Sequence, residues 1–321
     1  MSRGWFLLLV AAAWLGWPMP VAAQGGGVGE DSVPQKLDEN LAAHGLSLDA
    51  YMLQEGLRTF SGGADHGWGR SRMLGVALGL DLDTSLGLEG GSAFVEWYGV
   101  GGKTVSSFAG DLQAASNIQE RRRNLLAELW YQQRFLDDTW RLRLGKTDAN
   151  GEFAYVESAA EFLHSSAGFS PTVFPLPTFP DPTFSVNAEW SPPLGSVKVG
   201  VYDGATSKGK TTGNHGFGAY DGDLFLVAQI GTTWEAGGGG RAALGGWRHT
   251  GTFSRFDGGV ELSNEPGAGF RDSLELALEL YWRIDVDEHM AITPDGQFIR
   301  HPGGMGQNDA WIAGCRFEWR L

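Results

Sequence analysis

The sequence predicts an all-β protein, a transmembrane antiparallel up-and-down β-barrel of about twelve strands with a short N-terminal helix and a long constriction loop. Two observations favour this fold. Apolar and polar residues alternate with a period of two along most of the chain, and segments of about ten residues are joined by connections that are short and long in turn. Strands of soluble sheets are shorter, about five or six residues on average.

The N-terminus has the pattern of a secretory signal peptide. Arg3 precedes an apolar stretch from Trp5 to Trp17, and small residues ending at Ala23 follow it. A transmembrane anchor needs about twenty apolar residues, and the prolines after Trp17 argue against one. We therefore expect residues 1–23 to be removed as a signal peptide.

The remainder divides into a short segment and a barrel domain. Residues 24–45 are predicted to be a periplasmic segment with a short helix at Pro34–His44. The period changes to two immediately afterwards, so the barrel domain is expected to extend over residues 46–321. The predicted strands are 46–59, 72–83, 91–101, 123–136, 138–148, 182–191, 195–203, 222–235, 239–249, 273–285, 289–300 and 309–321.

Long and short connections alternate between these segments. The long ones are 102–122, 149–181, 204–221 and 250–272. This alternation is typical of outer-membrane barrels, and it predicts that both termini lie on the periplasmic side. Loop 149–181 is rich in Phe and Pro, so it needs apolar support, and we expect it to fold into the barrel and narrow it.

Composition excludes several classes of protein. The predicted leader holds one of the 24 basic residues and none of the 38 acidic ones, so 23 basic and 38 acidic residues remain and the formal charge falls from −14 to −15. Such an acidic chain predicts no nucleic-acid partner. The single cysteine, Cys315, excludes an internal disulfide, and no metal site or cofactor is expected. No G-x-S-x-G motif is present, which argues against a hydrolase.

Several stretches match a known family in order and spacing. The longest is Arg141–Pro193, which is similar to a strand, a long inward loop and the next strand of that family. Shorter ones are KVGVYDGA at 198–205, LFLVAQIG at 224–231, GGWRHTGTFSRFDG at 245–258, LELYWRI at 278–284, FIRHPGG at 298–304 and the C-terminal DAWIAGCRFEWRL. In these stretches the chain resembles the carbohydrate-selective porins of the OprB family.

The resemblance implies an outer-membrane porin of the Gram-negative type that allows passive, carbohydrate-selective diffusion of sugars and similar small polar solutes. It implies contact with outer-membrane lipid and leaves open whether copies form a homo-oligomer. The family's fold has sixteen strands, and about eighteen residues between Phe256 and Leu274 replace roughly four of them here. Because a narrower barrel leaves less room for a channel, a non-conducting structural or adhesive outer-membrane barrel is the alternative.

Polar residues opposite the apolar face are expected to line the lumen. Arg and Glu would hydrogen-bond sugar hydroxyls there, and aromatic side chains would pack on sugar rings. The alternative is that these charges pair with one another, or, for Asp148 and Asn150, that they only build the strand-to-loop turn. The candidate channel-lining residues are Arg141, Arg143, Asp148, Asn150, Glu152, Glu128, Trp130, Glu189, Lys198, Trp247, Arg248, Arg283 and Arg316.

Overall fold

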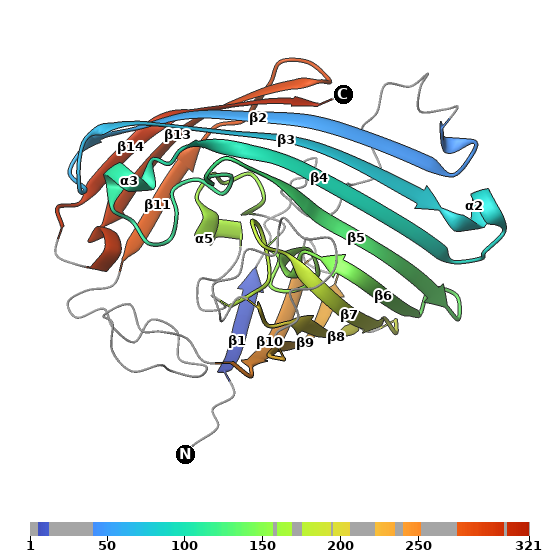
Figure 1. The fold of residues 1–321 in the computed structure, drawn as a ribbon. Coiled ribbons are helices and arrows are strands. Elements are labelled where there is room, and N and C mark those ends of the chain that lie inside the picture. Colours follow the sequence, from blue (N-terminus) through green and yellow to red (C-terminus); the bar gives the residue numbers. More distant parts are fainter. Residues whose placement is uncertain are drawn as a thin grey trace.

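The chain forms one antiparallel sheet that curves around its own long loops (Figure 1). The computed structural model describes residues 6–12, 41–156, 159–168, 175–193, 195–205, 222–234, 240–251, 275–304 and 307–320. The sheet has 14 strands in the order β1-β10-β9-β8-β7-β6-β5-β4-β3-β2-β14-β13-β11, with β12 beside β13. From β2 to β10 each strand pairs with its neighbours in sequence, which confirms the up-and-down topology.

Each predicted strand segment overlaps a strand of the structure. The segment 273–285 is interrupted and becomes β11 and β12. The strands are β1 (Phe6–Ala12), β2 (Leu46–Ser61), β3 (Gly67–Asp81), β4 (Gly91–Lys103), β5 (Arg123–Phe135), β6 (Trp140–Thr147), β7 (Thr183–Trp190), β8 (Ser196–Asp203), β9 (Leu224–Trp234), β10 (Gly240–His249), β11 (Leu276–Tyr281), β12 (Ile284–Asp285), β13 (Met290–Arg300) and β14 (Ala310–Arg320). The short helices are α2 (Leu82–Leu86), α3 (Ser106–Ala109), α4 (Ala149–Glu152), α5 (Ser165–Gly168) and η5 (Pro302–Gly304).

Strand β1 is not among the predicted strands. It lies within the predicted signal peptide and pairs antiparallel with β10, from Phe6 opposite Trp247 to Ala12 opposite Arg241. Without β1, the backbone groups along this edge of β10 would lack partners, and an extended apolar segment can pair with them. Removal of residues 1–23 remains a prediction. Of the predicted helix at Pro34–His44, only the last residues fall within the described part of the chain, and Leu41 and Ala42 are helical there.

The strand order begins at β1 and ends at β11, and no described strand joins these two ends. Closure of the barrel, which the sequence predicts, is therefore not made by the described strands. The segment 252–274, where family strands are predicted to be missing, lies outside the described residues. Among the residues that are described, no helix is long and apolar enough to cross a membrane.

The outer face of the sheet is apolar. Along β3, Leu74, Val76 and Leu78 are exposed, whereas the alternating Met73 and Ala77 are buried. Alternate residues of a strand point to opposite faces, so this pattern separates an outward apolar surface from the interior. A surface of this kind suits hydrocarbon. Aromatic residues lie near strand ends, including the stacked pair Trp140 and Trp190. The other exposed large residues of the strands include Leu142, Leu144, Val186, Val199, Val201, Ile230, Leu244, Leu278 and Phe317.

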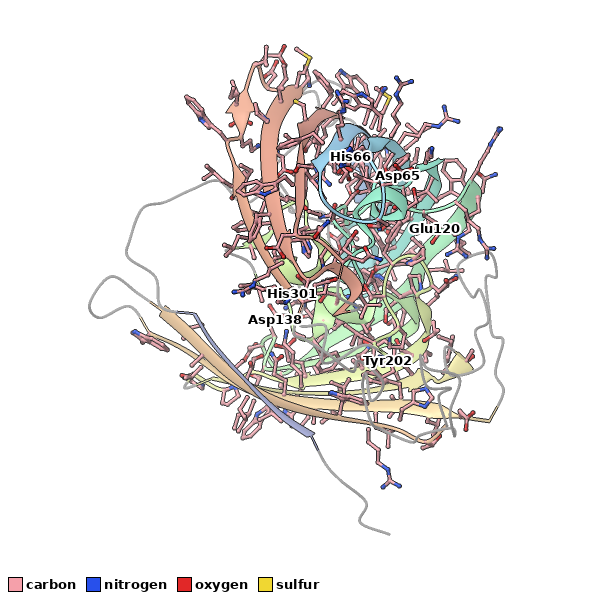
Figure 2. All side chains as sticks on the ribbon, turned by 90° about the vertical axis from the view of Figure 1, so that its left-hand side faces the viewer. Asp65, His66, Glu120, Asp138, Tyr202 and His301 are labelled. Atoms are coloured by element: carbon pink, nitrogen blue, oxygen red, sulfur yellow. The ribbon has the colours of Figure 1, made fainter. Side chains whose placement is uncertain are left out.

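Two long loops fold into the interior, where side chains such as Tyr202 fill the space between the arms of the sheet (Figure 2). The first loop, 104–122, packs Val105 and Ala115 among wall residues of β2, β13 and β14. The second, 148–182, packs Phe153 in a buried cluster with β8, β9 and β10. Only the second loop is predicted from the sequence to fold inward.

Substitutions on the outer face of β8 can test whether that face contacts membrane hydrocarbon. Val199 lies at the middle of the strand and Val197 near its short-turn end, on the same face. Because a charge is most costly at the bilayer midplane, Val199→Arg is expected to lower the free energy of unfolding by about 2–4 kcal/mol, and the matched Val197→Arg by about 0–1 kcal/mol. Urea titration of the refolded protein in lipid vesicles measures both. Equal costs at the two positions would contradict a membrane-facing surface.

Candidate functional site

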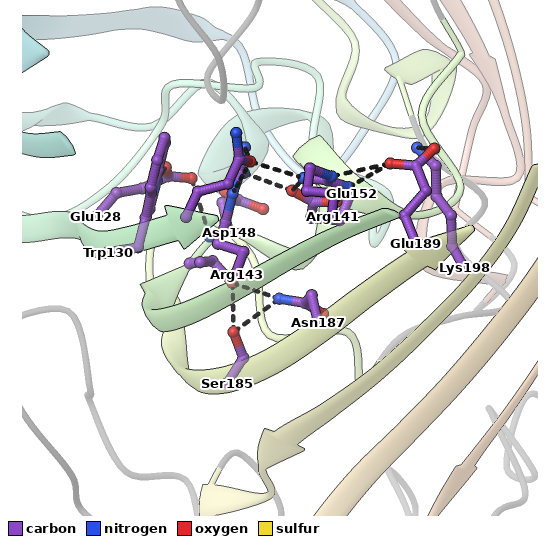
Figure 3. Close-up of polar contacts among 12 residues, drawn as sticks. Glu128, Trp130, Arg141, Arg143, Asp148, Glu152, Ser185, Asn187, Glu189 and Lys198 are labelled. Atoms are coloured by element: carbon purple, nitrogen blue, oxygen red, sulfur yellow. Dashed lines mark hydrogen bonds and ion pairs between the residues drawn. The ribbon is translucent and has the colours of Figure 1, made fainter. Parts of the chain in front are cut away.

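The centre of the candidate site is a carboxylate that binds two arginines (Figure 3). Arg141 and Arg143 are two residues apart on β6, so their side chains share its inner face. Glu152, at the end of α4, accepts hydrogen bonds from Arg141 Nη2 at 2.6 Å and from Arg141 Nη1 at 2.8 Å. It also forms an ion pair with Arg143. These contacts fasten the second loop to the wall at β6.

Glu152 is charged because of these partners. Burial alone would raise the pKa of its carboxyl group. The hydrogen bond from Arg141 and the charges of Arg143 and Arg141 outweigh that effect and lower the pKa to about 2. The ion pairs to β6 therefore persist at any pH near neutrality.

Neighbouring strands extend the row of alternating charges. Glu189 on β7 lies directly opposite Arg141 and binds its Nη2 at 2.7 Å. Lys198 on β8 lies opposite Glu189, with its Nζ 3.8 Å from the carboxylate. The side chains of Arg143, Glu189 and Lys198 remain 18%, 18% and 19% exposed. These three groups can therefore be reached by a small solute from the interior.

Gln132 also belongs to this cluster. Its Oε1 accepts hydrogen bonds from Arg143 Nη2 at 2.8 Å and from Arg141 Nη1 at 3.3 Å. The alternation along β5 places Gln132 on the inner face with Glu128 and Trp130. That signal identifies its face, but it does not reveal that one amide oxygen serves both guanidinium groups.

The indole ring of Trp130 packs against the guanidinium group of Arg143. The Arg143 Cζ lies 4.0 Å from the centre of the indole ring, and the Phe94 ring stacks on Trp130 at 5.2 Å. Phe94 comes from β4 and Arg143 from β6, the two strands that flank β5. The indole N–H donates to Glu128 at 2.6 Å. Because its ring is covered from both flanking strands, Trp130 positions an arginine and offers little bare aromatic surface.

Asp148 and Asn150 lie at the entrance of the second loop. The Asp148 N–H donates to Glu128, and its carboxylate accepts from the N–H groups of Asn150 at 2.8 Å and Phe179 at 3.0 Å. Burial raises the pKa of Asp148 to about 6. This residue therefore caps α4 and joins both ends of the loop. Asn150 contributes its backbone to the cap.

Arg283 makes a second charged cluster on the wall formed by β11 and β14. Its Nη1 lies 2.8 Å from Glu318 and 3.2 Å from Glu161 of the loop. On the same wall, Glu279 accepts the N–H groups of Leu163 at 2.7 Å and His164 at 3.0 Å. The second loop is thus fastened to both sides of the interior.

The remaining candidates lie apart from the β6 cluster. Arg316 is buried in an ion pair with Glu55 and donates to Asn117 of the first loop at 2.5 Å. Trp247 is buried against Phe225 with ring centres 5.9 Å apart. Arg248 follows Trp247 directly in β10, so it points to the opposite, outer face. Trp247 and Arg248 therefore lie on opposite faces of β10, and a channel-lining role for either stays a prediction.

The family model for "Carbohydrate-selective porin, OprB family" matches residues 65–273 and 265–321. The chain belongs to the OprB family. The match falls into two parts that meet at 265–273, within the region where strands are predicted to be missing. Membership in a porin family implies a channel and not an enzyme, and OprB porins are outer-membrane proteins.

Solved structures support the fold. The high-pH structure of OprB from Pseudomonas putida is similar with a TM-score of 0.78 and 14% sequence identity, over 89% of this chain and 96% of that chain. The low-pH structure of the same protein gives a TM-score of 0.56 and 12% identity, over 89% and 95% of the two chains. A search of curated proteins found no match.

The contact between Glu279 and the second loop can be tested by Glu279→Gln. Glutamine offers one acceptor oxygen where the carboxylate uses two, so one loop N–H loses its partner. We expect the loop to loosen, with faster proteolytic cleavage within 149–181. The matched control is Glu288→Gln, whose side chain is 87% exposed. Equal cleavage rates for the variant, the control and the native chain would show that Glu279 does not hold the loop.

His164 predicts a dependence of stability on pH. Burial lowers its pKa from the usual 6.5 to about 4, so the folded loop takes up a proton less readily than the unfolded chain. The neutral imidazole therefore contributes stability that is present above pH 6.5 and is lost as the pH falls through about 4. Between pH 7 and pH 4, the free energy of unfolding should fall less steeply for His164→Gln than for the native protein. The exposed His289→Gln is the control, and parallel curves for all three proteins would refute the effect.

Proposed function

We propose that this chain is a passive pore for sugars and similar small neutral solutes. The observation that carries the proposal is the array of Arg141, Arg143, Glu152 and Glu189 on the inner wall, in which every charge has a partner of opposite sign. Guanidinium groups donate hydrogen bonds and carboxylates accept them. A sugar hydroxyl does both, so it can exchange contacts along such a row.

Charge balance favours neutral solutes over ions. The four groups in direct contact carry two charges of each sign, and Lys198 adds one further charge at 3.8 Å from Glu189. Paired charges of this kind present a weak net field to a passing ion. A polyol, in contrast, needs only local donors and acceptors. The array therefore fits a neutral sugar better than an anion.

The N-terminal pattern supports delivery to the outer membrane. Residues 1–23 would be cleaved as a signal peptide, residues 24–45 would remain in the periplasm, and residues 46–321 would form the barrel in contact with lipid. Chemical crosslinking of the native membrane would reveal whether copies associate as a homo-oligomer.

The alternative is a non-conducting structural or adhesive barrel. It is supported by the packing of two loops in the interior, where Ala115 and Leu163 lie in one buried cluster.

Single-channel recording separates the two functions. The refolded chain is placed in planar bilayers and glucose is added to one side at increasing concentration. We expect steady openings that glucose blocks in a saturable manner. Silence from a protein that is folded, as judged by its altered migration on gels after heating, would refute the pore and leave the structural role.

Selectivity provides a sharper test of the charge array. Glu152→Gln would leave two guanidinium groups without their shared carboxylate, so we expect the reversal potential in a KCl gradient to shift towards anion selectivity. Glu288→Gln removes the same charge at an exposed position and should not shift it. An unchanged reversal potential in Glu152→Gln would show that the array does not face the conduction path.

A further inference from the structure

We propose that Phe162, Tyr281 and Arg283 form a second sugar-contact site, on the opposite side of the loop from the Arg141 and Arg143 cluster. The inference rests on the proposed pore function and goes beyond it by adding a site and its ligand class, a pyranose ring with free hydroxyl groups. In the sheet order, β11 is separated from β6 by β13, β14, β2, β3, β4 and β5.

An aromatic pair forms the apolar part of this site. Tyr281 belongs to the inward-facing row of β11, because Leu278 and Leu280 beside it are exposed on the outer face at 58% and 82%. Phe162 of the second loop meets it edge to face, with ring centres 4.7 Å apart and an angle of 73° between the rings. The faces of aromatic rings are apolar and carry negative partial charge, so the C–H groups of a sugar ring can pack on them.

Arg283 forms the polar part. It is held by Glu318 at 2.8 Å and Glu161 at 3.2 Å, so the guanidinium plane is fixed by the wall and the loop. The side chains of Arg283, Glu161 and Glu318 are 23%, 24% and 14% exposed, against 11% for Arg141, 18% for Arg143 and 4% for Glu152. This cluster is therefore the more accessible of the two that the loop makes with the walls.

The Tyr281 hydroxyl completes the set. No hydrogen bond to another residue within the described part of the chain is found for it, and the side chain is only partly buried. A phenol in this position can both donate and accept. Tyr281 lies two residues before Arg283, and its ring contacts that of Phe162. An apolar surface, a hydroxyl without a hydrogen-bond partner among the described residues and a fixed guanidinium thus lie within one short stretch of the wall, and together they match the two kinds of surface on a sugar ring.

The test uses Tyr281→Phe, which removes one oxygen and keeps the ring. The loss of one hydrogen bond to the solute is expected to raise the glucose concentration for half-maximal block of single-channel current by about fivefold. Tyr131→Phe is the matched control, since Tyr131 is exposed on the outer face and its hydroxyl bonds to Gln133.

A second variant addresses the aromatic surface. Phe162→Leu keeps an apolar side chain but removes the aromatic ring, so block of the channel by glucose should weaken. Block by sorbitol, an open-chain polyol, should stay as weak as in native channels. Block of both variants by glucose at the same half-maximal concentration as native channels would refute the second site and leave the pore function standing. If native channels are not blocked by glucose at all, both proposals fail.

Discussion

The ion pairs of Glu152 with Arg141 and Arg143 determine where the second loop lies. A buried carboxylate without partners would be costly, and so would two guanidinium groups sharing one wall. Each group therefore requires the others, and the loop that carries Glu152 cannot leave β6 without exposing an unpaired charge to the interior. The capping of α4 by Asp148 and the packing of Phe153 against the wall follow from this position.

Carboxylates on the wall accept hydrogen bonds from backbone N–H groups of the inward loops. Loop segments inside a barrel form few regular hydrogen bonds, and each unpaired N–H would be unfavourable. Glu279 accepts two such groups, and Glu275 accepts those of Leu112 at 2.9 Å and Gln113 at 2.9 Å. These two carboxylates of the wall thus act as hydrogen-bond acceptors for the backbone of the loops.

The fold could be predicted from the sequence because strand periodicity and the length of the connections are local properties. The same alternation correctly places Arg141, Glu189 and Lys198 on one inner surface. Alternation alone cannot show which partners those residues bind, because Glu152 lies in a loop and not in a strand.

Partners distant in sequence explain the other differences. Arg316 is held by Glu55, 261 positions away, so no local pattern marks it as buried. The register of β4 and β5 also shifts between Glu96 and Trp97, which changes the inward residues beyond that point. The separation of Trp247 from Arg248, in contrast, follows from the period of two and needs no tertiary information.

The attachment of the second loop to both β6 and β11 has a mechanical consequence. Glu152 fastens the loop to β6, and the N–H groups of Leu163 and His164 fasten it to Glu279 on the other wall, so the loop links the two walls. We expect this link between the two walls to oppose deformation of the protein by the surrounding bilayer.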